Sequence, residues 1–86
     1  MRHITSEQLD RLAPLLEELR QVSELREKKR GVFYRKSRAF LHFHEDPRGL
    51  FADLRLAGPD FDRFEVTSRA QQRALAKRIR TALRDT

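Results

Sequence analysis

The chain has 86 residues, of which 38% are hydrophobic and 37% charged, and it carries a formal net charge of +6 without a single cysteine. This length predicts one domain over residues 1–86 and leaves no room for a second. It argues against a deep enclosed substrate cavity, because such a small domain buries only roughly 60–65% of the surface that its unfolded chain exposes. The missing cysteines exclude disulfides, thiolate metal sites and a cysteine nucleophile, and they fit a reducing cytoplasm.

The positive charge is concentrated in two blocks. Residues 26–38 contain seven basic side chains and one acidic one, and residues 68–86 contain six basic and one acidic. The intervening residues 39–67 have three basic side chains against six acidic ones. This clustering favours a surface that attracts phosphates. No apolar segment approaches the length of a membrane span, so we expect a cytoplasmic protein without a membrane partner.

The first helix is predicted from its capping residues. Thr5 is a good N-cap, and Gln8 three residues later completes a capping box. Pro14 falls inside the helical pattern, where it removes a hydrogen bond to Asp10 and costs about 3 kcal/mol unless a kink absorbs it. We therefore expect either a bend or two helical pieces, the second opened by Pro14. The leucines form one apolar stripe: Leu9, Leu12, Leu16 and Leu19.

Residues 21–31 allow three interpretations. They could extend the helix, with Gly31 after its end and cations in its last turn. They could also form a loop or a short edge strand. The sequence favours a break of the helix after residues 20–22.

Residues 31–56 alternate between apolar and polar side chains and contain two turns, which predicts an antiparallel meander. A two-residue turn at Lys36–Ser37 pairs three sets of residues: Arg35 with Arg38, Phe33 with Phe40, and Val32 with Leu41. A four-residue loop at 46–49 pairs four more: Glu45 with Leu50, Phe43 with Ala52, His42 with Asp53, and Leu41 with Leu54.

This register divides the side chains between two faces of the sheet. The predicted core face carries Val32, Tyr34, Ala39, Leu41, Phe43, Leu50, Ala52, Leu54 and Leu56. The predicted second face carries Phe33, Arg35, Phe40, His42, His44, Phe51, Asp53 and Arg55.

The last third of the chain predicts a short strand over residues 61–66 and a closing helix. Ser68 caps this helix and Gln71 completes a second capping box. Its inward side chains are Leu75, Ile79, Ala82 and Leu83. The predicted fold is therefore α+β: an antiparallel sheet of three to four strands, flanked by an N-terminal and a C-terminal helix.

Three side chains on the second face could hold a divalent metal ion. His42 and His44 alternate along one strand, and Asp53 is predicted opposite His42. Two imidazoles and a carboxylate are ligands for zinc and related ions. A polar cross-strand pair without a metal is the commoner explanation, so we assign no metal or other cofactor from the sequence.

The basic blocks provide the first functional hypothesis, a nucleic-acid-binding module that is not an enzyme. Phosphates would be bound by basic side chains of the first turn and of the closing helix, and neighbouring aromatic rings could stack on bases. A charged, solvated surface is the plain alternative. The phosphate-binding candidates are Arg35, Lys36, Arg38, Arg69, Arg73, Lys77, Arg80 and Arg84.

The second hypothesis is a protein-interaction or homodimerisation domain. Its interface would be the second sheet face, at Phe33, Phe40 and Phe51. Catalytic residues are not predicted, since no glycine-rich phosphate loop or nucleophile motif is present and the serines have capping or turn positions.

The order of the segments also resembles a known group. After a helix come Gly31-Val32-Phe33-Tyr34, a basic turn, Ala39-Phe40-Leu41-His42-Phe43, Gly49-Leu50-Phe51-Ala52-Asp53-Leu54-Arg55, Val66-Thr67-Ser68 and a closing helix. This pattern, from about Leu9 to Leu83, resembles the MmcQ/YjbR-like group of small bacterial α+β proteins, although the tryptophan usual near their last strand and their typical C-terminal segment are missing. The resemblance implies an α+β fold and, through related domains labelled double-wing DNA-binding, a DNA-binding role.

Overall fold

The structure is a computed structural model that describes residues 2–84, apart from the side chain of Arg2. The elements follow one another as β1 (Arg2–His3), α1 (Ser6–Arg11), α2 (Ala13–Arg20), β2 (Arg26–Lys29), β3 (Val32–Arg35), β4 (Arg38–Asp46), β5 (Gly49–Leu54), β6 (Asp62–Glu65) and α3 (Arg69–Arg84). The strands form one antiparallel sheet in the order β2-β3-β4-β5-β6, and the short β1 pairs with β4. This confirms the predicted α+β fold, with β1 as a strand that was not predicted and β2 as the edge strand that was one interpretation of residues 21–31.

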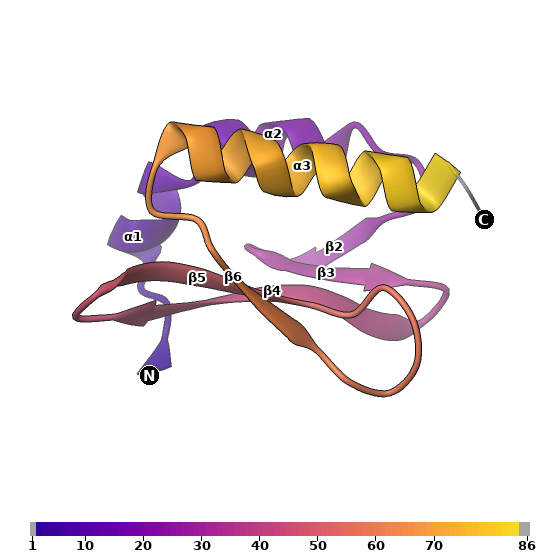
Figure 1. The fold of residues 1–86 in the computed structure, drawn as a ribbon, viewed down its shortest axis with the longest axis horizontal. Helices are drawn as coiled ribbons and strands as arrows, with labels where there is room; N and C mark the ends of the chain where they lie inside the picture. The colour runs from indigo at the N-terminus through magenta and orange to yellow at the C-terminus, as the bar shows by residue number, and fades with distance from the viewer. Residues whose placement is uncertain (1, 85–86) are drawn as a thin grey trace.

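The helices and the sheet form two layers (Figure 1). Helices α2 and α3 lie side by side over one face of the sheet, with α1 at one end. Among the described residues, no helix lies on the other face, which we call the open face. No helix within residues 2–84 is long and apolar enough to cross a membrane.

Capping residues fix where the helices begin. The Gln8 backbone N–H donates to Thr5 Oγ1 (3.3 Å), as the capping box requires, but the Thr5 N–H donates to Glu45 Oε1 (2.7 Å) instead of to Gln8. Pro14 lies in the first turn of α2, where its missing N–H costs no hydrogen bond. The alternative with two helical pieces is therefore confirmed.

The cap of α3 is the complete box that the sequence predicts. The Gln71 N–H donates to Ser68 Oγ (3.1 Å), and the Ser68 N–H donates to Gln71 Oε1 (2.9 Å). The predicted stripe packs inward, with Leu75, Ile79 and Leu83 buried. Gln72, in the first turn of the same helix, is 2% exposed and donates through Nε2 to the Val66 carbonyl (3.0 Å), so this buried amide is satisfied.

The chain between α2 and β3 resolves the three interpretations in favour of an edge strand. Helix α2 ends at Arg20, and β2 pairs with β3. Glu27 connects the two ends of this segment: its carboxylate accepts from the Arg20 guanidinium and from the Gly31 N–H (2.9 Å). The hydrogen bond from Arg20 holds the pKa of Glu27 below its usual value.

The second hairpin has the predicted register, whereas the first departs from it. Strands β4 and β5 pair as predicted, from Leu41 with Leu54 to Glu45 with Leu50. Arg35 also pairs with Arg38, but Phe33 pairs with Leu41 because the ladder shifts by one residue at a β-bulge. Phe40 is the extra residue of β4. The predicted pairs of Phe33 with Phe40 and Val32 with Leu41 are wrong.

The bulge changes which face several side chains occupy. Phe33 and Phe40 are 1% and 3% exposed and belong to the hydrophobic core. Because side chains alternate along a strand, Tyr34 and its partner Ala39 lie on the open face, and both are half-buried. Val32, one residue before the buried Phe33, is half-buried as well and lies outside the core cluster. The predictions that Phe33 and Phe40 lie on the second face, and that Val32, Tyr34 and Ala39 lie on the core face, are therefore wrong.

Candidate functional sites

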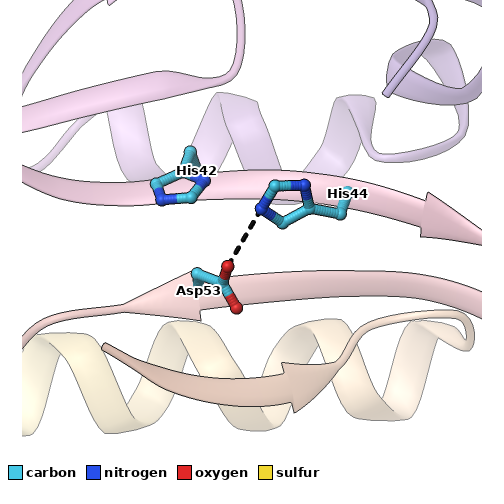
Figure 2. A group of neighbouring side chains, drawn as sticks. All are labelled: His42, His44 and Asp53. Carbon is cyan, nitrogen blue, oxygen red and sulfur yellow. Dashed lines mark ion pairs between the residues drawn. The ribbon is translucent and has the colours of Figure 1, made fainter. Parts of the chain in front are cut away.

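The first candidate site is a cluster of two histidines and an aspartate on the open face. Figure 2 shows His42 and His44 on β4 and Asp53 on the neighbouring β5, with the three side chains turned toward one another. Asp53 pairs with His42 in the ladder, as predicted. One potential ligand atom from each of the three residues lies within 4.8 Å of the other two. The structure thus brings together all three predicted metal candidates.

Asp53 is the best-connected member of this cluster. Its Oδ2 atom lies 2.9 Å from His44 Nε2, and its two oxygens accept from Arg63 Nε (2.8 Å) and Nη2 (3.0 Å). The residue is only 7% exposed. Burial by itself would raise the pKa of Asp53, but the Arg63 hydrogen bonds and the positive charges nearby outweigh it, and the pKa lies below its usual value.

His42 is packed between two other rings. Its ring centroid lies 4.9 Å from that of His44 and 5.1 Å from that of Phe61, in edge-to-face arrangements. Burial lowers the pKa of His42, and the negative charge of Asp53 counteracts this only in part. Burial therefore favours the neutral imidazole, which is the form that binds metal ions.

The second candidate site is a hollow at the end of the sheet, formed by the β3–β4 turn and the loop after β5. Its volume is about 300 Å³. The cations that line it are Arg35, Lys36, Arg38 and Arg55, and among the described residues no acidic side chain lines it. Arg55 donates to the Ala39 carbonyl through Nε (3.0 Å) and Nη2 (2.6 Å). We call this site the basic hollow.

The turn that carries the basic hollow has an unfavourable backbone. Lys36 has φ 51° and Ser37 has φ 69°, both in the left-handed region that asparagine and glycine tolerate best. A two-residue hairpin of this kind normally takes Asn-Gly or a similar pair. Strained positions of this sort are concentrated at functional sites, so the lysine in this turn is a reason to look for a ligand.

The predicted residues of the closing helix form a separate surface. Arg69, Arg73, Lys77, Arg80 and Arg84 are all exposed. Arg80 forms an ion pair with Glu18 of α2, and Arg69 Nη1 donates to Oε1 of Gln72 in the same helix (2.8 Å). The stripe lies in the helix layer, whereas the basic hollow is at the end of the sheet, so the structure separates the predicted phosphate-binding residues into two groups.

The interface predicted at Phe33, Phe40 and Phe51 does not form on one face of the sheet. Phe33 and Phe40 are in the core, and only Phe51 remains on the open face, half-buried. Its ring lies beneath the guanidinium of Arg48, with the Cζ atom 5.4 Å from the ring centroid.

The sequence analysis missed other aromatic side chains on the open face. The guanidinium of Arg55 lies 4.6 Å from the ring centroid of Phe61, and Lys28 Nζ lies 4.6 Å from that of Tyr34. Arg63 was missed as well, although it pairs directly with Asp53 in the ladder between β5 and β6. Alternation along residues 61–66 could have placed Arg63 on this face. Nothing in the sequence around Phe61 indicates that its ring lies over β4.

Comparisons with protein-family models, with curated proteins and with solved structures give no match for this chain. The resemblance to the MmcQ/YjbR-like group therefore stays a prediction, and the function has to be argued from the two sites themselves.

Proposed function

We propose that this protein is a nucleic-acid-binding module that holds the phosphates of a single strand at the basic hollow. The observation that carries this proposal is the gathering of four cations from two segments of the chain around one small hollow. Cations that line one hollow make the electrostatic potential there positive, and a positive potential attracts an anion. A phosphate group provides the charge and the acceptor oxygens that guanidinium groups bind best.

The open face next to the hollow supports a single strand over a duplex. Arg55 belongs to both surfaces: it lines the hollow and lies over the ring of Phe61. Half-buried Tyr34, Phe51 and Phe61 each lie under a cation on this face. Unpaired bases can stack on aromatic rings and guanidinium planes, with about 1–3 kcal/mol per base.

The helix surface extends the proposal to longer strands. The C-terminal end of α3 and the β3–β4 turn lie at the same end of the molecule (Figure 1). Lys77 and Arg84 are exposed on that half of the helix. A strand long enough to pass from the basic hollow to the helix layer would reach these cations, whereas Arg73 lies nearer to the other end of α3.

The test is a titration of a fluorescently labelled single-stranded oligonucleotide, followed by anisotropy at several salt concentrations. Four phosphate contacts predict a slope of log affinity against log salt of about −2.8, which is a loss of about 50-fold between 50 and 200 mM salt. A flat salt dependence, or no binding at 50 mM salt, would refute the proposal.

Two variants that each remove one positive charge locate the site. Lys36→Ala should weaken binding and reduce the salt slope by about 0.7, which is one phosphate contact. Arg73→Ala, from an exposed position in the N-terminal half of α3, should leave both nearly unchanged. Equal losses in the two variants would mean that the net charge binds nucleic acid without a defined site.

A further inference from the structure

We propose that His42, His44 and Asp53 bind a divalent transition-metal ion of the zinc type on the open face of the sheet. The inference is independent of nucleic-acid binding, because it concerns other residues and can be measured without any oligonucleotide. It rests on the backbone that holds the ligands, on the separation of their donor atoms and on their chemistry.

The backbone under this cluster is a regular ladder. The bulge at Phe40 lies before the cluster, and from Leu41 to Asp46 every residue of β4 has its partner on β5. Alternation places His42 and His44 on the same face, and pairing places Asp53 beside them. Ligands on two hydrogen-bonded strands are held more precisely than ligands on loops, so little ordering is needed when an ion binds.

The donor atoms are close to the spacing that a tetrahedral ion requires. Metal–ligand bonds of about 2.0–2.1 Å place two ligand atoms about 3.4 Å apart in tetrahedral geometry. In the structure, one donor atom from each of the three residues lies within 4.8 Å of the others. Binding therefore requires the two rings to turn so that the donor atoms come up to about 1.4 Å closer together.

The ligand set selects among metals. Two imidazole nitrogens favour zinc and similar transition metals over calcium and magnesium, which prefer oxygen ligands. Three protein ligands leave a further coordination position, and the half-buried histidines leave that position accessible from solvent.

Neighbouring side chains would orient the ligands. Binding would replace the His44 Nε2–Asp53 Oδ2 contact by two bonds to the ion. Arg63 keeps its hydrogen bond from Nε to Oδ1, and its Nη2, which donates to Oδ2 (3.0 Å), would share that oxygen with the ion. Phe61 lies edge-to-face against the His42 ring, with the ring centroids 5.1 Å apart. Such supporting contacts fix ring orientation and tune ligand strength in metal sites.

The primary test is calorimetric titration of the whole chain with Zn²⁺ near pH 7.5, together with the visible absorption of its Co²⁺ complex. We expect one ion per chain and intense absorption typical of four-coordinate Co²⁺. At a Zn²⁺ concentration about 100-fold above the Kd, the melting temperature should rise by about 10–20 °C. Absence of saturable binding up to about 100 µM Zn²⁺ would overturn the proposal. One ion per two chains would also overturn it, because the ion would then lie between molecules.

Variants assign the ligands. His42→Gln and His44→Gln should each reduce the affinity for Zn²⁺ at least tenfold and abolish the four-coordinate Co²⁺ spectrum. His3 provides the matched control: it pairs with His44 from β1, but its ring centroid is 6.3 Å from that of His44, and it is outside the cluster. His3→Gln should change the affinity less than threefold, and a loss equal to that of His42→Gln would refute the three-residue site.

Discussion

The turn at Lys36–Ser37 gives the sharpest prediction, because it separates backbone strain from ligand binding. A residue with a Cβ atom costs about 1–2 kcal/mol in the left-handed region, and Ser37 has φ 69°. Glycine at this position removes that cost but makes the unfolded chain more flexible, which costs about 0.5–1 kcal/mol. Ser37→Gly should therefore stabilise the fold by about 0.5–1 kcal/mol, or by roughly 2–8 °C in melting temperature for a domain of this size.

Lys36→Asn is the companion variant. Asparagine tolerates the left-handed region better than lysine, so this variant should melt at or above the temperature of the natural chain. It also removes one of the four cations of the basic hollow. Its affinity for single-stranded nucleic acid should fall, whereas Ser37→Gly should keep full affinity.

The assays are thermal and urea unfolding followed by circular dichroism, and the anisotropy titration described above. An unchanged or lower melting temperature for Ser37→Gly would show that the turn carries no strain in solution. Full affinity in Lys36→Asn would show that the lysine in this turn is not a phosphate contact.

Two further predictions concern the core and the open face. Phe40→Ala should destabilise the fold by about 3–5 kcal/mol in urea unfolding, because its ring is buried. Phe51→Ala, from a half-buried position, should lower the free energy of unfolding clearly less. Equal losses in the two variants would contradict the bulge. Arg63→Met should lower stability only modestly near pH 7, since the guanidinium is half-exposed and screened by solvent. Because Arg63 helps to lower the pKa of Asp53, this contribution is present above about pH 5 and is lost as the pH falls through that lowered pKa, so unfolding curves of the two proteins should converge in acid. A difference that is constant with pH would show that Arg63 acts by packing alone.

The elements of the fold follow from local rules that the sequence displays directly. Pro14 disfavours one straight helix and lies in the first turn of α2, and Ser68 with Gln71 defines the start of α3 through hydrogen bonds between neighbours. The β4–β5 register follows from the turn and from side-chain alternation on both strands. This local information is also what placed His42 opposite Asp53.

The facing of the first hairpin is a tertiary property. A regular ladder would leave Phe33 and Phe40 on the open face, where their apolar surface meets water. The bulge turns both rings toward the helices, and burial of each large side chain contributes about 1.5–3 kcal/mol, which outweighs the local disruption of the ladder. Only the presence of the helix layer makes this burial available.

The sequence by itself therefore determined the two helical regions, the Ser68–Gln71 cap, the register of the second hairpin and the three residues of the histidine–aspartate cluster, because each depends on residues near one another along the chain or across one turn. The tertiary structure decided which aromatic rings are core, brought Arg55 to the basic hollow, and placed Phe61 and Arg63 beside the cluster. Those contacts join separate strands and a loop, and their geometry is set by packing between the two layers and across the sheet.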